Sequence, residues 1–137
     1  MKRISDGEKQ WSRIIGSPKD DQPSGVSIGL DGSIYISGYT SGDLDGEINS
    51  GGSDIFVSKF TTDGNKEWTK LLGSNGNDGD EALFTGLDGS IYISGTTDGD
   101  LEGQTNSGDL DSFLIKLRVN DDTGVIRGSS YYKIVNG

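Results

Sequence analysis

The chain has 137 residues, a net charge of −10, 23 glycines, and neither histidine nor cysteine. Binding to phosphate requires lysine and arginine, so this charge argues against nucleic acid and anionic membranes as partners. Without histidine and cysteine the chain has no disulfide, lacks the usual general base, and cannot form Ser-His or Cys-His nucleophile pairs. We therefore expect a protein that is not an enzyme.

The first residues carry positive charge without an apolar run after it, so we expect no Sec-type signal peptide. No stretch of the sequence reaches the length of a transmembrane helix, so we expect no membrane insertion. The localisation stays unknown at this stage. Acidic β repeats favour a cell surface or a virion over the cytoplasm.

An internal repeat is the strongest signal in the sequence. Residues 31–38 read DGSIYISG and recur unchanged as residues 88–95, an offset of 57. The same offset relates residues 6–60 to residues 63–117 without gaps, with 28 identities in 55 pairs. We expect a single repeat domain over 1–137, with repeat one at about 6–62, repeat two at about 63–119 and a divergent C-terminal strand in 120–137.

Each repeat predicts four strands, because apolar residues alternate with polar ones in short runs bounded by turn residues. In chain order the expected strands cover residues 8–15, 24–30, 33–40, 54–61, 65–72, 81–87, 90–97 and 111–119, with a further strand in Val125–Val135. Asp31-Gly32 and Asp63-Gly64 predict two-residue type I′ hairpins, which need positive φ at both central residues. No segment shows helical periodicity.

Three sequence runs carry a family resemblance: DGSIYISG at 31–38, GGSDIFVSKF at 51–60 and DGNKEW at 63–68. Over roughly residues 6–120 the chain resembles the bacterial SBBP repeat family of seven-bladed β-propellers. The resemblance implies an all-β fold of two four-stranded antiparallel propeller-type blades and implies no reaction. Arrays of this family usually hold many repeats, whereas this chain holds two.

In such a meander the long polar loops gather at one end of the blades, and the Asp-Gly turns lie at the other. The loop end holds 14 of the 22 acidic residues, and within its loops only Lys19 opposes them. These acidic residues are Asp20, Asp21, Asp43, Asp45, Glu47, Asp54, Asp78, Asp80, Glu81, Asp98, Asp100, Glu102, Asp109 and Asp111.

One loop resembles a calcium site. Asp98, Asp100 and Glu102 stand at positions 1, 3 and 5, glycine follows at position 6, and Asp109 occupies position 12. The first repeat is degenerate: it keeps Asp43, Asp45 and Gly46 but has Ser41 at position 1 and Gly52 at position 12. The alternative is that the aspartates bond their own backbone in Asx-turns, which is common chemistry in loops. Ca²⁺ is therefore the cofactor that this loop suggests, and no other cofactor is indicated.

The aromatic residues allow two interpretations. Trp11 and Trp68 stand at equivalent strand positions and could stack against sugars, although packing against a neighbouring strand is favoured. Tyr35 and Tyr92 alternate with isoleucines, which favours packing between blades.

The sequence leaves three functions open. The first is a structural or interaction module with an acidic loop face, such as an exposed envelope or virion accessory protein. The others are a lectin-like glycan binder and a Ca²⁺-dependent adhesive module. Two blades leave packing faces uncovered, since propellers close with about four to eight blades. We therefore expect a homo-oligomer, with a trimer favoured, or docking on a larger assembly.

Overall fold

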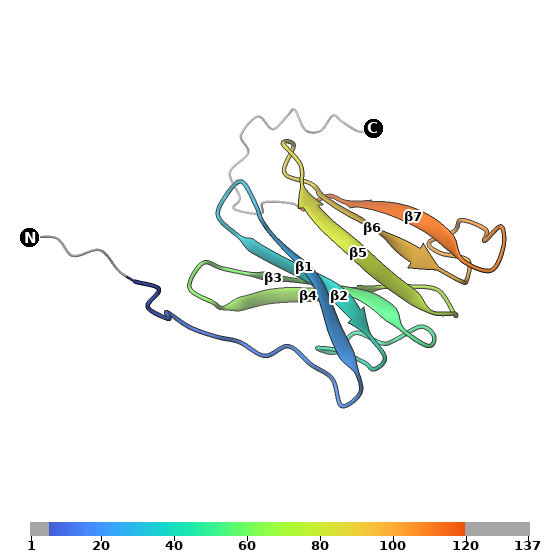
Figure 1. The fold of residues 1–137 in the computed structure, drawn as a ribbon, viewed down its shortest axis with the longest axis horizontal. Helices are drawn as coiled ribbons and strands as arrows, with labels where there is room; N and C mark the ends of the chain where they lie inside the picture. Colours follow the sequence, from blue (N-terminus) through green and yellow to red (C-terminus); the bar gives the residue numbers. More distant parts are fainter. Residues whose placement is uncertain (1–5, 120–137) are drawn as a thin grey trace, which may run out of the picture.

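In the computed structural model the described part of the chain is residues 6–119, which form two antiparallel sheets (Figure 1). The strands are β1 (Asp21–Ile28), β2 (Ile34–Thr40), β3 (Asp54–Phe60), β4 (Lys66–Leu72), β5 (Asp78–Thr85), β6 (Ile91–Thr97) and β7 (Asp111–Leu117).

The first sheet has the order β1-β2-β3-β4 and the second has the order β5-β6-β7. This arrangement confirms the all-β class and the two propeller-type blades. The second blade has three strands within residues 6–119, not four, and the expected strand in Val125–Val135 lies outside the described residues. No helix among the described residues is long and apolar enough to cross a membrane.

The tight turns differ from the predicted type. At the first turn Gly32 N donates to Gly29 O at 3.0 Å, Gly29 N donates to Ser33 O at 2.8 Å, and only Gly32 has positive φ. The hairpin loop therefore has three residues, a type I turn followed by a left-handed glycine, and not two residues of type I′. Asp31 Oδ1 accepts from Ser33 N at 2.9 Å and braces the turn.

Each first strand contains a bulge that explains a repeated glycine. The register of β1 against β2 shifts between Pro23 and Gly25, and β5 has the equivalent shift between Asp80 and Ala82. A Cβ on Gly38 would lie 1.9 Å from the carbonyl oxygen of Gln22. The backbones approach so closely that only glycine fits. Past the bulge the pairing continues, so β1 and β5 begin three residues earlier than predicted.

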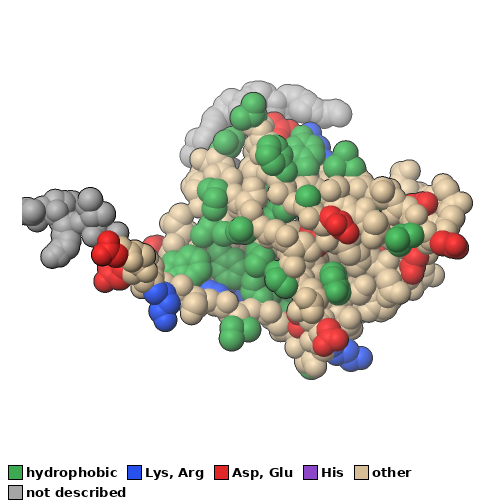
Figure 2. Space-filling view, in the orientation of Figure 1, with side chains coloured by type: hydrophobic (Ala, Val, Ile, Leu, Met, Phe, Trp, Pro, Cys, Tyr) green, Lys and Arg blue, Asp and Glu red, His purple; other side chains and the backbone are tan. Residues whose placement is uncertain are grey.

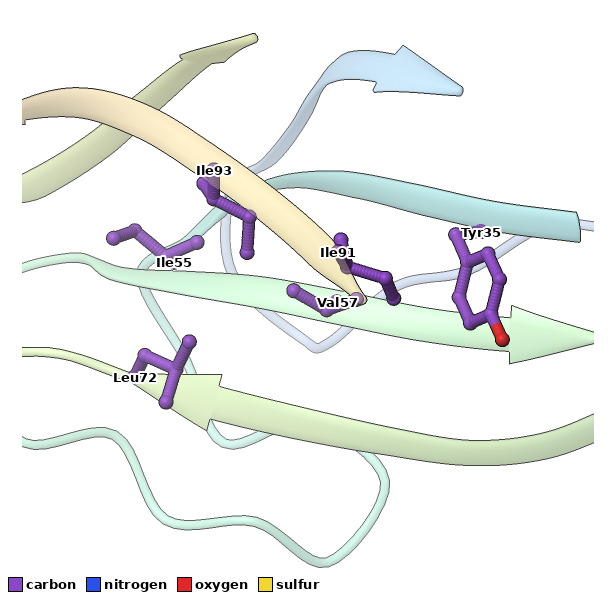
Figure 3. Close-up of a cluster of buried hydrophobic side chains, with 6 residues drawn as sticks. All are labelled: Tyr35, Ile55, Val57, Leu72, Ile91 and Ile93. Atoms are coloured by element: carbon purple, nitrogen blue, oxygen red, sulfur yellow. The ribbon is translucent and has the colours of Figure 1, made fainter. Parts of the chain in front are cut away.

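The core lies between the two sheets (Figure 3). Ile55, Val57 and Tyr35 of the first sheet pack against Ile91 and Ile93 of β6, and all five side chains are buried. Ile55 and Val57 belong to the face of β3 that also carries Leu72 of the neighbouring strand. The burial of Tyr35 confirms the predicted packing between blades.

Residues 8–15 form no strand, and this prediction was wrong. They run beside the first sheet as an extended segment (Figure 1), which we call the N-terminal arm. Its contacts with the body include the Trp11 indole donating to Thr62 O at 3.1 Å and Arg13 Nε donating to Gly64 O at 2.6 Å. A strand requires a partner edge, and alternation of residue types cannot supply one.

Apolar side chains remain exposed on the outer face of each blade. Val26 and Ile28 of β1 are 64% and 58% exposed, and Phe84 and Leu114 of the second blade are 67% and 73% exposed. Figure 2 shows a hydrophobic patch over the first sheet. Both outer faces therefore expose apolar side chains to solvent.

Candidate functional site

The two sheets bring their long connections to one end of the molecule, as the meander topology requires. This loop end comprises residues 16–20, 41–53, 73–77 and 98–110, while the tight turns 29–33, 61–65 and 86–90 lie at the other end. On the face seen in Figure 2, acidic side chains stand out over the loop end at the right. The predicted separation of the two ends follows directly from the observed strand order.

Each long loop carries a small hairpin that the sequence interpretation missed. Leu44 N and Glu47 O are 3.0 Å apart, and Glu47 N and Leu44 O are 2.9 Å apart. Between them Asp45 and Gly46 both have positive φ, which is type I′ geometry. Residues 101–104 repeat this hairpin with Glu102-Gly103 at its tip. The type I′ turns therefore occur in the long loops, and the Asp-Gly pair at 45–46 was the available signal.

A buried leucine anchors each hairpin. Leu44 is fully buried and Leu101 is 4% exposed, although each is an isolated apolar residue within a polar loop. Burial of a whole leucine side chain contributes about 1.5–3 kcal/mol. The loops are thus fixed to the blades by apolar packing as well as by polar bonds.

Carboxylate and amide side chains also hold the loops, by accepting hydrogen bonds from backbone N–H groups. Asp43 Oδ1 accepts from Asn49 N at 2.8 Å, and Asp100 Oδ1 accepts from Asn106 N at 2.8 Å. Asn49 Oδ1 in turn accepts from Gly51 N at 2.8 Å. The bond from Gly51 N to Asn49 is an Asx-turn, and the aspartates bond the backbone of their own loops over a longer span. This backbone bonding is the alternative to calcium binding that the sequence predicted.

The proposed calcium ligands have different neighbours. Asp98 Oδ1 accepts from Asn77 N at 2.7 Å on the preceding loop, whereas Asp100 faces Asn106 of its own loop. Glu102 lies at the hairpin tip, and Asp109 is exposed near the start of β7. Within residues 6–119 no three acidic side chains lie close enough together to hold a metal ion. Calcium binding at this loop stays a prediction.

Asp45, in the first repeat, has a different environment from its second-repeat counterpart Glu102. Its Oδ2 lies 2.7 Å from the Lys66 ammonium on β4 and also accepts from the Thr69 hydroxyl. Partial burial alone would raise the pKa of Asp45, but the bonds from Lys66 and Thr69 outweigh it and lower that pKa. The carboxylate is therefore charged at neutral pH and pins the hairpin to β4.

Three of the predicted loop-face carboxylates are buried and do not contribute to an exposed acidic surface. Asp54 is fully buried, Asp78 is 1% exposed and Asp80 is 6% exposed. Asp78 accepts from Ser74 N at 2.7 Å and from the Thr97 hydroxyl. These carboxylates hold strands and loops together inside the fold.

Asp54 and Asp80 each have one buried oxygen, Oδ1, without a hydrogen-bond partner among the described residues. Burial raises the pKa of both carboxyls, against bonds from Ser50 to Asp54 and from Ser37 to Asp80. A Cβ on Gly73 would lie 2.2 Å from Asp54 Oδ1, so the glycine is what makes room for this buried acid. Desolvation favours the protonated form of both groups.

The aromatic residues divide between packing and exposure. The Trp68 ring lies 6.2 Å from the Tyr35 ring, and Trp68 packs against the core. This contact supports packing as the role of that tryptophan. Trp11 is 36% exposed on the N-terminal arm, and Tyr92 lies half-buried on the outer side of the second blade.

A groove of about 880 Å³ opens between the blades near the tight turns. Trp68, Leu117 and Val119 form its apolar side, and Lys59 and Glu67, which pair at 3.3 Å, form part of its polar side. This groove was not predicted from the sequence, because its residues come from both repeats.

Comparisons with known proteins support the architecture. Residues 10–45 match the SBBP beta-propeller repeat family. A curated relative, the regulatory protein FlaEY of Caulobacter vibrioides, is 33% identical over 79 residues, which are 53% of this chain and 8% of that protein. The chain therefore spans only a small part of the relative's length. The SBBP match confirms the type of repeat predicted from the sequence, and it covers the arm, β1, β2 and the start of the first long loop.

Proposed function

We propose that the chain is a non-catalytic interaction module whose loop end meets a partner with a basic surface. The observation that carries this proposal is the charge of the exposed loop end. Asp20, Asp43, Asp98 and Asp109 are exposed there, and among described loop-end carboxylates only Asp45 forms an ion pair. A surface of one sign accelerates and orients the approach of a partner of the opposite sign.

The rigidity of the loops supports a binding role. Their hairpins are anchored by Leu44 and Leu101 and braced by Asp43 and Asp100, so the carboxylates project from fixed backbone. A preformed surface loses less conformational entropy when it binds a partner. The loop end therefore has the properties expected of a preformed docking surface, whereas flexible loops would only interact with solvent.

Similarity to known proteins also favours interaction over catalysis. The SBBP match identifies a repeat of a propeller, an architecture without an inherent reaction, and FlaEY is described as a regulatory protein. The buried acids Asp54, Asp78 and Asp80 bond to serine or threonine residues of their own fold. The envelope or virion setting, the glycan partner and the calcium-dependent adhesive role stay predictions from the sequence.

The test uses a fluorescent octalysine peptide as a defined basic probe. We expect it to bind the intact chain at low salt and to be released as the salt concentration rises, because exposed charges are screened within about 10 Å at 0.1 M. A loop-end variant combines D20N, D43N, D98N and D109N. Asparagine side chains at positions 43 and 98 can still accept the backbone bonds, so the fold is kept while four charges are removed.

The matched control removes four exposed charges elsewhere, by D6N, E8Q, D63N and E67Q. Both variants have the same net charge, so non-specific attraction weakens equally in the two proteins. The proposal expects the loop-end variant to bind at least about tenfold more weakly than the control, as measured by fluorescence anisotropy. Equal affinities of the two variants would show that the loop end is not the docking surface.

A further inference from the structure

Within residues 6–119, the outer edge of β7 lacks the fourth strand that covers the equivalent edge of β3. In the first blade β3 pairs with β2 on one side and with β4 on the other. In the second blade β7 pairs with β6, and no strand within residues 6–119 covers its other edge. An unpaired edge leaves backbone N–H and C=O groups available for another segment.

The N-terminal arm has the sequence of such a strand. Residues 9–15 read KQWSRII and align at the 57-residue offset with residues 66–72, KEWTKLL, which form β4. Ile14 on the arm is 97% exposed, whereas its counterpart Leu71 on β4 is half-buried. The arm thus carries the pattern of a blade's fourth strand, while Ile14 lies in solvent.

The contact of the arm with the first blade resembles the position of Trp68 beside the second blade. Trp68 of β4 packs near Val119, just past β7, where both residues line the groove between the blades. Trp11 donates to the carbonyl of Thr62, and Thr62 is the residue that the offset makes equivalent to Val119. The arm therefore lies beside the first blade in the position that the fourth strand of a preceding blade would occupy. Within residues 6–119, no strand of such a blade pairs with the arm.

We propose that residues 9–15 of one copy add to β7 of a second copy and complete its blade. The register of β3 and β4 fixes the register of this pairing. In the first blade Ser58 lies opposite Thr69, so Ile115 should lie opposite Ser12 of the second copy. Lys59 lies opposite Trp68, so Lys116 should lie opposite Trp11.

The slot beside β7 offers the arm a pocket and a residue of opposite charge. A pocket of about 570 Å³ lies between the second long loop and β7, and it is lined by Leu101, Glu102 and Phe113. In the first blade the equivalent loop residue, Asp45, binds Lys66 of β4. The offset makes Lys9 the equivalent of Lys66, so an inserted arm brings a lysine to the carboxylate of Glu102.

The outer faces of the blades support the same assembly. Val26 and Ile28 of the first blade are exposed, while Ile91 and Ile93 lie on the matching face of the second blade and are buried against the first blade. A neighbour whose second blade receives the arm would cover Val26 and Ile28 with the face that carries Phe84 and Leu114. The added strand and the packed faces belong to one continuous head-to-tail interface.

The C-terminal segment is a poorer match for the slot. At the same offset Thr123 stands in the place of Lys66 and Val125 in the place of Trp68. It therefore lacks the charge that complements Glu102 and the indole that packs beside a tyrosine. A head-to-tail interface makes a ring when the rotation closes. Three copies with two blades each would make six blades, within the range of about four to eight that propellers use.

The test uses disulfides in a chain that has no natural cysteine. Ser58 Oγ and Thr69 Oγ1 lie 2.7 Å apart in the first blade, so cysteines at the equivalent positions 12 and 115 should pair between copies. A tagged S12C chain and an untagged I115C chain are mixed and oxidised, then separated by electrophoresis. We expect a mixed disulfide-linked dimer that neither chain forms when the other is absent.

Ile115 packs partly against the core, so a second pair uses exposed positions. Val57 lies opposite Lys70 in the first blade, so R13C of one copy should lie opposite L114C of the other. Leu114 is exposed, so this pair leaves the core intact. Failure of both pairs to form a mixed dimer overturns the proposal. An I115C/I126C chain tests the tail, because a disulfide within one chain there would show that the C-terminal segment fills the slot.

Mass measurement by light scattering gives an independent test on the full chain. We expect a threefold multiple of the 14.5 kDa chain mass. The S12P/I14P variant should fall to the monomer, because proline cannot donate to a strand ladder. D6P lies outside the pairing segment and should keep the oligomer. A wild-type chain that is monomeric at ~100 μM, far above the Kd of a stable strand exchange, would overturn the proposal.

Discussion

The Asp45 carboxylate reaches from the tip of the first long loop to the Lys66 ammonium on β4, with 2.7 Å between Oδ2 and Nζ. Glu102 occupies the same point of the second loop, beside a blade edge that no described strand covers. The first repeat thus has both the loop carboxylate and the strand lysine. Within residues 6–119 the second repeat has only the carboxylate. Under the proposed strand addition, Lys9 of a second copy would give Glu102 the partner that Lys66 gives Asp45.

The first prediction concerns this ion pair. K66M should lower the free energy of unfolding by less than about 1 kcal/mol, because both side chains are about one-third exposed and surface ion pairs contribute little. Urea unfolding at low salt and at 0.5 M NaCl measures the effect, which should shrink in salt. K70M, on the same strand, serves as the control. A loss above about 2 kcal/mol would mean that the pair is desolvated more than its exposure indicates.

The second prediction concerns the leucine anchor of the loop. L44A should lower the free energy of unfolding by about 2–5 kcal/mol, because it removes a fully buried side chain and leaves a cavity. I48A lies in the same loop at 72% exposure and should change stability by less than about 0.5 kcal/mol. Thermal unfolding of the two variants gives the comparison. Equal effects would show that the hairpin is not anchored by apolar packing.

The sequence predicted the inner strands well because their signals are local. Ile34, Tyr35 and Ile36 place apolar side chains on both faces of a strand, and the same run recurs in the second repeat. The structure has β2 and β6 at these two runs. The start of β1 was placed too late, since its polar residues continue pairing beyond the bulge at Pro23. A bulge depends on the close approach of two backbones, which residue types alone do not reveal.

The loop end was harder to predict, because its organisation depends on contacts across the fold. An isolated leucine in a polar loop gives no periodic signal, so the burial of Leu44 was missed. Asp54 and Asp80 were assigned to an exposed acidic face but are buried. Their burial depends on neighbours such as Gly73 and Ser37, which come from other strands and loops.

The third prediction concerns the bulge. G38A should destabilise the chain by about 1–3 kcal/mol or more, because its Cβ would lie 1.9 Å from the Gln22 carbonyl oxygen, and backbone must move to relieve the overlap. Gly108 has no heavy atom within 4 Å of the position that a Cβ would take, so G108A is the matched control. Chemical denaturation should separate the two clearly. Similar stabilities would indicate that β1 can shift without cost.

The fourth prediction concerns the buried Asp80. Its pKa is raised by burial, so the folded chain holds a proton that the unfolded chain has lost above about pH 4. The folded state then loses stability as the pH rises from the unfolded pKa through the folded one. D80N cannot titrate, so its stability relative to the wild type should increase across that interval.

Denaturant unfolding at a series of pH values from 3 to 8 tests this sign. D63N removes an exposed carboxylate and should give a difference from the wild type that is nearly independent of pH. Asp88, whose pKa is lowered to about 2 by the Ser90 backbone bond and by Lys116, contributes the opposite trend at lower pH. A D80N difference that falls as the pH rises would contradict a raised pKa.

The last prediction concerns calcium at the second long loop. Ca²⁺ requires about six to eight oxygen ligands at 2.3–2.6 Å, whereas Asp98 and Asp100 accept backbone bonds from different loops. Both carboxylates would have to turn toward one point, so we expect binding only in the millimolar range. Calorimetry with millimolar Ca²⁺, together with the thermal shift, measures it. D100N should weaken binding because one anionic ligand is lost, while the amide oxygen that it introduces still accepts the Asn106 bond and keeps the loop folded. D43N makes the same change in the repeat with fewer carboxylates and should have little effect. The absence of both heat and thermal shift in the wild type would leave these aspartates with the backbone-bracing role alone.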